Sequence, residues 1–250
     1  MRILLAALTC PKGDIKGNLD RHLGVVARAT QSACDLVVFP EMSLTGYRAG
    51  AAIGLEDPAV KILISATAGS AAAAFGLAER PPDGGRPTIT QVVAIDGRPA
   101  VVHRKAHLGE GEDADFVPGQ PSGAVCVAGV RCSLAICAEI GTEAPYAVAA
   151  ELVLAPAAPG LHGRRTTPQA WEDGYRWWRG SVLDDASRFA VPNGRWVAVA
   201  TQAGATDDED FPGWAAVIDP SGRPVAETAD GRESLLAVDV PLPDPRRREV

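Results

Sequence analysis

The stretch DLVVFPE (35–41) is a short apolar run that ends, after a proline, in the carboxylate of Glu41. A run of this kind predicts a buried strand. Lys105 and Cys137 also come just after runs of strand type, so the three residues share one kind of position. A rigid scaffold presents its site residues at such positions. The strand ends therefore predict a site that contains Glu41, Lys105 and Cys137.

Around this stretch, strands alternate with helices in the first and third quarters of the chain, and hairpins fill the middle. That order of elements is typical of a layered α/β fold in which helices cover the sheets. Strands are predicted over residues 3–8, 35–39, 71–77, 88–95, 99–103, 124–128, 131–136, 152–155, 196–201, 214–218, 224–227 and 235–240. Helices are predicted over residues 18–30, 58–68 and 170–190. No linker, low-complexity stretch or tandem repeat interrupts the pattern, so one domain over residues 1–250 is the simplest interpretation.

The composition favours a globular protein that binds a small molecule. Hydrophobic residues make up 46% of the chain and charged residues 22%, which suits a sizeable core. The net charge of -7 disfavours nucleic acid as a partner, because domains that bind it more often carry a basic excess. No apolar stretch approaches the ~20 residues of a transmembrane helix, and the N-terminal apolar run is too short for a signal peptide. A cytoplasmic protein without membrane contact is expected.

The five cysteines form no pattern of pairs. An odd number without a CxxC spacing disfavours both a disulfide framework and a structural zinc site. Cysteine often behaves as a small buried hydrophobe. Four of the five are predicted in the core: Cys10, Cys34, Cys126 and Cys132.

Two further stretches have plain structural interpretations. The helix over 170–190 is rich in tryptophan, and its Trp171, Trp177 and Trp178 cannot all share one helix face. Most of these side chains are predicted as core or dimer contacts. The acidic run 207–210 is predicted as a solvated loop.

Cys137 needs help to act as a nucleophile, because a thiol is weak while it is protonated. Glu41 could take its proton, and Lys105 could hold the negative charge of a tetrahedral intermediate. Competing chemistries have less support, since GxSxG, GxGxxG and Walker-type motifs are absent. His103 and His107 are four residues apart but lack the further ligand of a zinc motif. His107 is predicted to buttress the site or its loop.

Three segments resemble the nitrilase superfamily of carbon–nitrogen hydrolases: VVFPEMSLTGY (37–47), HRKAHLGEGEDADFVPGQ (103–120) and LAICAEI (134–140). That family shows a Phe-Pro-Glu, a Tyr-Arg-Lys-x-His-Leu and a Gly-x-x-Ile-Cys-Tyr-Asp type motif in this order. The resemblance continues through VAVATQAG (197–204) and GWAAVIDPSGRPVAE (213–227), so it covers essentially the whole chain. Three ordered motifs at compatible spacings are a specific signal.

The resemblance implies a four-layer α-β-β-α sandwich and a Glu-Lys-Cys triad. Carried over by position, Glu41 is the general base and Cys137 is the nucleophile. Lys105 stabilises the tetrahedral intermediate. The backbone N–H of Ala138, directly after the nucleophile, completes the oxyanion hole.

The family also has a second glutamate, a few residues before a Phe-x-Pro-Gly sequence. Glu112 maps onto it, and Glu110, slightly earlier in the loop, is the competitor. After the nucleophile, Glu139 stands where the family usually has aspartate. Arg164 and Arg165 could clamp a substrate carboxylate or form a solvated pair. The predicted substrate contacts are Phe116, Glu139, Arg164 and Arg165.

The implied reaction is hydrolysis of a small linear amide or N-carbamoyl compound through a thioester on Cys137, with no metal or organic cofactor. Nitrile hydrolysis and acyl transfer use the same triad and stay open. A non-catalytic binding protein that keeps the fold is the alternative from another class. The pocket positions around Ala138 and Pro156 depart from the family, so the substrate is left open. The resemblance and the Trp-rich helix favour a homodimer or larger homo-oligomer.

Overall fold

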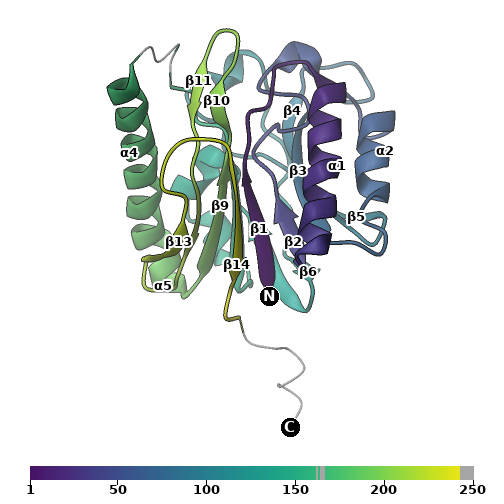
Figure 1. The fold of residues 1–250 in the computed structure, drawn as a ribbon. Coiled ribbons are helices and arrows are strands. Elements are labelled where there is room, and N and C mark those ends of the chain that lie inside the picture. The colour runs from purple at the N-terminus through teal and green to yellow at the C-terminus, as the bar shows by residue number, and fades with distance from the viewer. Residues whose placement is uncertain (162, 164–166, 243–250) are drawn as a thin grey trace.

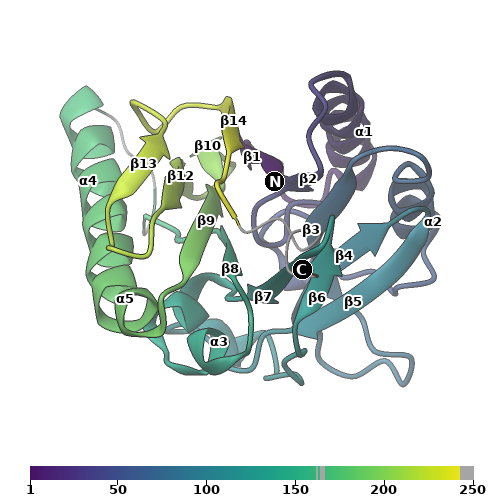
Figure 2. The same ribbon diagram turned by 90° about the horizontal axis from the view of Figure 1, so that it is seen from below.

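The computed structural model describes residues 1–161, 163 and 167–242. Two six-stranded sheets lie face to face, and helices cover the outer face of each sheet (Figures 1 and 2). The covering helices are α1 (Ile15–Gln31) and α2 (Pro58–Ser65) on one side and α4 (Pro168–Asp185) with the short α5 (Val191–Asn193) on the other. This order of layers confirms the predicted α-β-β-α sandwich.

The first sheet has its strands in the order β14–β1–β2–β3–β4–β5. Their bounds are β1 Arg2–Ala7, β2 Leu36–Val38, β3 Ala72–Glu79, β4 Thr88–Ile95, β5 Arg98–Arg104 and β14 Ser234–Asp239. β1, β2 and β3 are parallel, whereas β4 runs against both β3 and β5. β5 therefore points the same way as β2, and the residues that follow these two strands lie at the same end of the sheet.

The second sheet has its strands in the order β13–β12–β9–β8–β7–β6. Their bounds are β6 Val125–Val127, β7 Val130–Leu134, β8 Leu152–Ala157, β9 Trp196–Thr201, β12 Ala215–Ile218 and β13 Pro224–Glu227. β7, β8 and β9 are parallel, and β6, β12 and β13 are antiparallel to their neighbours. A separate two-stranded ribbon joins β10 (Ala203–Ala205) to β11 (Asp210–Pro212).

Three apolar layers hold the sandwich together. Ile3 of the first sheet and Leu134 of the second belong to the cluster between the sheets. α1 and α2 cover the first sheet through Val26 and Leu63, and α4 covers the second through Trp178. Full burial of a valine, leucine or isoleucine side chain contributes about 1.5–3 kcal/mol, so these layers dominate the stability of the scaffold.

The helices begin at caps that the sequence supplies. The Asp14 side chain accepts a hydrogen bond from Gly17 N at 3.0 Å at the start of α1, and Asp57 caps α2 in the same way. The predicted helix over 170–190 is α4 followed by a π-helical turn, η4 (Ala186–Ala190), and then α5. The remaining short helices are η1 Ala49–Ala51, η2 Glu112–Ala114, η3 Cys137–Gly141 and α3 Ala144–Ala147. Within the described ranges, no helix is both long and apolar enough to cross a membrane.

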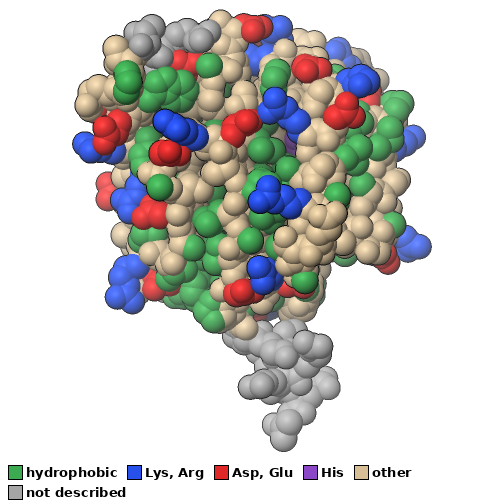
Figure 3. Space-filling view, viewed as in Figure 1, with side chains coloured by type: hydrophobic (Ala, Val, Ile, Leu, Met, Phe, Trp, Pro, Cys, Tyr) green, Lys and Arg blue, Asp and Glu red, His purple; other side chains and the backbone are tan. Residues whose placement is uncertain are grey.

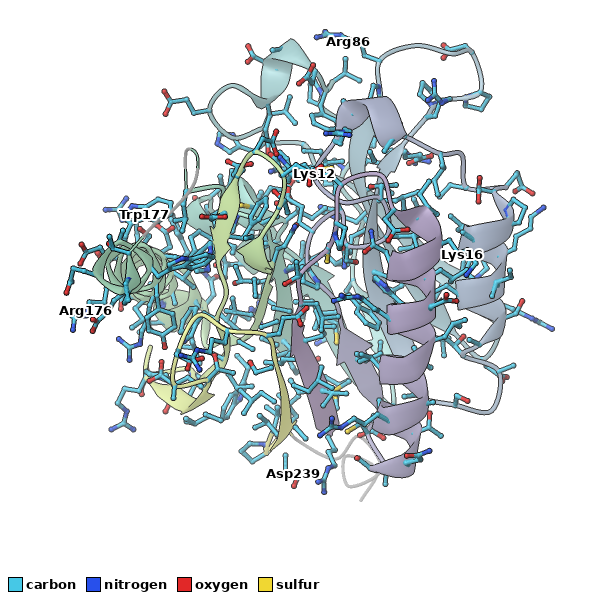
Figure 4. All side chains as sticks on the ribbon, turned by 45° about the horizontal axis from the view of Figure 1, so that its top comes forward. Lys12, Lys16, Arg86, Arg176, Trp177 and Asp239 are labelled. Atoms are coloured by element: carbon cyan, nitrogen blue, oxygen red, sulfur yellow. The ribbon has the colours of Figure 1, made fainter. Side chains whose placement is uncertain are left out.

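The acidic run 207–210 is not simply a solvated loop. Asp208 and Glu209 both pair with Lys12, at 2.7 and 3.4 Å, and Lys12 lies beside the β10–β11 ribbon (Figure 4). Asp210 is buried in β11. The two strands of the ribbon contain Gly204, Asp210 and Pro212 and so lack the apolar run that marks β2, and the sequence did not predict this ribbon.

One surface position differs from expectation. Cys126 is exposed, because it is the middle residue of β6 and its neighbours Val125 and Val127 are the ones buried. Trp178 is in the core, but Trp177 is 52% exposed and projects from α4 (Figure 4). Charged side chains of both signs are interspersed over the face seen in Figure 3. The homodimer or larger homo-oligomer stays a prediction.

The turn that carries Glu41 is packed directly on β3. Phe39 N donates to Ala74 O and Leu44 N to Gly76 O, each at 2.8 Å, so residues 39–44 run along that strand. A Cβ at Gly76 would lie 2.4 Å from Met42 N. The absence of a side chain at Gly76 is therefore what lets this turn approach the sheet.

We expect Gly76→Ala to lower the free energy of unfolding by about 2 kcal/mol, because the new methyl group overpacks against backbone atoms that cannot move independently. Chemical denaturation measures the change. Gly24→Ala in α1 is the matched control, since a Cβ there meets nothing within 4 Å. That variant should be neutral or stabilising by up to about 1 kcal/mol. Equal stability of Gly76→Ala and the wild type would show that the close approach is not a constraint.

Candidate active site

The ends of three strands bring Glu41, Lys105 and Cys137 to one place, as the sequence predicted. Glu41 lies in the turn after β2, Lys105 directly follows β5, and Cys137 begins η3 after β7. Lys105 Nζ lies 2.8 Å from Glu41 Oε1 and 2.8 Å from Glu112 Oε1. The Lys105 and Glu41 side chains are completely buried. The site is therefore a buried lysine held between two carboxylates.

Glu41 uses its second oxygen to reach the other sheet. Ala158 N, just past the end of β8, donates to Glu41 Oε2 at 2.9 Å. Burial raises the pKa of Glu41 to about 7, with Lys105 acting in the opposite direction and Glu112 adding to the rise. A carboxylate with a pKa near neutrality is suited to accept and return a proton.

Glu112, rather than Glu110, makes the contact with Lys105. Glu110 is exposed, whereas both oxygens of Glu112 are occupied. Oε1 accepts from Lys105 and from the Tyr47 hydroxyl, and Oε2 accepts from Gly109 N at 2.6 Å. The sequence prediction did not assign a role to Tyr47, although it stands in the quoted segment 37–47. Its hydroxyl donates to the same oxygen of Glu112 as Lys105, while the loop backbone donates to the other oxygen.

Cys137 sits in a strained backbone conformation. Its φ is +47°, which a side-chain-bearing residue rarely adopts, and Met42, directly after Glu41, has φ +46°. Backbone strain of this kind concentrates at functional sites. Phe116 is buried beside Cys137 in a small apolar cluster, which is consistent with its predicted place in the pocket.

The groups around Cys137 have opposing effects on the pKa of its thiol. Burial raises the pKa of the thiol far above its ordinary value, and Glu41 adds to this, while Lys105 and the Ala158 N–H favour the thiolate. Burial alone would lower the pKa of Lys105, but Glu41, Cys137 and Glu112 outweigh it, so its pKa is raised and the lysine is cationic. At rest, Cys137 is therefore a thiol beside a base and a fixed positive charge.

Ala138 follows the nucleophile as the second residue of η3. The first N–H groups of a helix have no acceptor within the helix. The backbone N–H of Ala138 is thus in the kind of position that an oxyanion hole requires, and its predicted role stands as a prediction.

The geometry of Glu139 does not fit a substrate contact. Its carboxylate is buried and accepts from Ile136 N at 2.9 Å, from Ala106 N at 2.7 Å and from His103 Nε2 at 3.0 Å. These contacts occupy both oxygens within the protein. The sequence missed this role because a glutamate in a catalytic motif gives no sign of which way its side chain faces.

The remaining predicted residues have separate outcomes. His107 is exposed, whereas His103 is buried and contacts Glu139. Arg164 and Arg165 lie outside the described residues. In the described part of the chain, no group of three or more His, Cys, Asp or Glu side chains is arranged to hold a metal ion.

A partly buried thiol, a buried lysine and two buried carboxylates, placed where the strand ends of the two sheets meet, are the parts that a covalent hydrolase needs. The model of the carbon–nitrogen hydrolase family matches residues 4–247, and the chain belongs to that family.

Individual relatives agree with this assignment. An (R)-stereoselective amidase from a Pseudomonas species is 29% identical over 95% of this chain and 84% of its own length. A glutamine-dependent NAD(+) synthetase from Xylella fastidiosa is 26% identical over 96% of this chain, which corresponds to 44% of that larger protein. The solved structure of an amidase from Nesterenkonia sp. AN1 aligns with a TM-score of 0.81 and 28% identity, covering 99% of this chain and 92% of that one. In that structure, the acetamide moiety of fluoroacetamide is covalently attached to the active-site cysteine.

We expect Tyr47→Phe to weaken the placement of Glu112, because it removes one of the two donors to Oε1. The lost hydrogen bond to a charged group should cost about 2 kcal/mol of unfolding free energy. Hydrolytic turnover should fall about tenfold, since small misplacements at a catalytic centre are costly. Denaturation and steady-state kinetics measure the two effects.

Tyr175→Phe is the matched control. Tyr175 belongs to α4, and its partly buried hydroxyl donates to Thr228 O at 2.8 Å. It makes no hydrogen bond to a catalytic group in the described part of the chain. This variant should lose some stability and keep its turnover. If Tyr47→Phe keeps full turnover as well, the hydroxyl has no part in positioning Glu112.

Proposed function

We propose that this protein hydrolyses a small linear amide, with Cys137 as the nucleophile, Glu41 as the general base and Lys105 as the stabilising cation. The observation that carries the proposal is the Lys105 ammonium group held at 2.8 Å from both Glu41 and Glu112 next to the strained Cys137. Similarity to two amidases, one of them with a covalent adduct on its cysteine, supports amides over other substrates of the family.

In the first half of the reaction, the Cys137 sulfur attacks the amide carbonyl carbon while Glu41 takes the thiol proton. The oxyanion that forms is stabilised by Lys105 and by the backbone N–H of Ala138. Collapse of the tetrahedral intermediate breaks the carbon–nitrogen bond. Glu41 returns the proton to the departing nitrogen, so ammonia or an amine leaves and a thioester remains.

In the second half, water attacks the thioester carbon. Glu41, now a carboxylate again, accepts a proton from this water, and Glu112 helps to orient it. The carbon–sulfur bond breaks, the acid product leaves, and the proton returns to Cys137. Each half of the reaction uses Glu41 once as a base and once as an acid, which requires a pKa near the working pH. The value of about 7 suits that requirement.

Cys137→Ser is expected to abolish turnover and to leave the fold intact, because the hydroxyl is smaller and a far weaker nucleophile than the thiol. Ammonia release should be measured across primary amides, N-carbamoyl amino acids and nitriles, first with the wild type and then with the variant. Thermal unfolding checks that the variant is folded.

The control is Cys126→Ser, since Cys126 is exposed on β6 and outside the site. Its turnover should equal that of the wild type. Turnover retained in Cys137→Ser would refute the covalent mechanism. Activity confined to nitriles would support the catalytic role of the triad but contradict the amide substrate. A wild type that shows neither activity nor an acyl adduct would favour a binding protein that has kept the fold.

A further inference from the structure

His103 and Glu139 form a buried pair behind the catalytic groups. His103 Nε2 lies 3.0 Å from Glu139 Oε2, and the two side chains are 3% and 5% exposed. Neither residue has a role in the reaction steps above. We propose that this pair positions Lys105 and the loop that carries Glu112 against Cys137, an inference that rests on the proposed function of that site.

Glu139 joins the two sheets at the site. Its Oε1 accepts from Ala106 N, the residue after Lys105, at 2.7 Å. Its Oε2 accepts from Ile136 N, the residue before Cys137, at 2.9 Å. One carboxylate therefore fixes the backbone beside the lysine relative to the backbone beside the nucleophile.

His103 connects the loop that carries Glu112 to the same carboxylate. Ser122 N donates to His103 Nδ1 at 3.1 Å, so Nδ1 is an acceptor and the ring proton of a neutral imidazole is on Nε2. Nε2 therefore donates to Glu139. Ser122 lies near the end of the segment that connects β5 to β6. In the same segment, Gly119 N donates to Lys105 O at 2.8 Å.

The charge of Glu139 is stabilised by N–H donors. Burial by itself raises its pKa, but the hydrogen bonds from His103, Ile136 and Ala106 outweigh burial, and the pKa lies below its ordinary value. The His103 donor is the one side-chain donor among these three. Its loss would leave part of a buried carboxylate unsatisfied and would free the loop at Ser122.

The chain departs from the family motifs at both members of the pair. Histidine stands at 103 where the motif has tyrosine, and glutamate stands at 139 where it has aspartate. A longer acid and a histidine that contacts it form one matched unit. The structure thus assigns to this chain a buried contact between two residue types that the general motif does not have at these positions.

The test compares His103→Gln with His103→Asn. The amide nitrogen of glutamine reaches about as far as Nε2 and can still donate to Glu139, although glutamine has no acceptor for Ser122 N. The amide nitrogen of asparagine reaches only as far as Nδ1, so the comparison isolates the contact with Glu139. We expect His103→Asn to lower kcat about tenfold or more with KM within about twofold, as a misplaced catalytic group would. His103→Gln should keep kcat within about threefold of the wild type. Both variants should remain folded by thermal unfolding.

A second readout does not depend on the substrate. The rate at which iodoacetamide alkylates Cys137, followed by peptide mass, should fall in His103→Asn and not in His103→Gln, because a displaced Lys105 no longer favours the thiolate. If the two variants match each other in both kcat and alkylation rate, the pair does not position the site. A wild type that hydrolyses no amide would overturn the proposed function alone, because the alkylation rates would still test the positioning role of the His103–Glu139 pair.

Discussion

Lys105 keeps its charge inside the protein because two buried carboxylates flank it, each at 2.8 Å. An isolated buried ammonium group would be strongly destabilising, and so would either carboxylate without it. The remaining oxygens of Glu41 and Glu112 accept from backbone N–H groups, so the cluster is hydrogen-bonded as well as paired. Burial raises the pKa of Glu41, Lys105 acts against this rise and the nearby Glu112 adds to it, so that the pKa is about 7.

The sandwich is built so that this cluster can exist. Glu41 and Lys105 follow parallel-pointing strands of one sheet, while Cys137 and Ala158 follow strands of the other. The contacts from Ala158 to Glu41 and from Glu139 to the backbone after Lys105 cross between these two groups of elements. The site therefore depends on both sheets and on the apolar layer between them.

Most of the scaffold could be predicted from the sequence, because its helices show apolar periodicity and most of its strands stand out as apolar runs between turns. Positions at strand ends singled out Glu41, Lys105 and Cys137, and ordered motifs added Glu112. The contacts of Tyr47, His103 and Glu139 were not readable. Each depends on where a side chain points after a turn, and tertiary packing decides that. The ribbon of β10 and β11 was missed because Gly204, Asp210 and Pro212 interrupt its short strands, so that neither shows an apolar run.

The central claim is that burial beside Lys105 makes Glu41 a base that works near neutral pH. The most direct measurement is the pH dependence of kcat/KM for a neutral primary amide, which reports ionisations of the free enzyme. Because Glu41 acts as a carboxylate and its pKa is raised to about 7, kcat/KM should be low in acid and should rise as the pH passes through about 7. An acid limb near the ordinary glutamate value of about 4.3, or a flat profile across neutrality, would contradict the account.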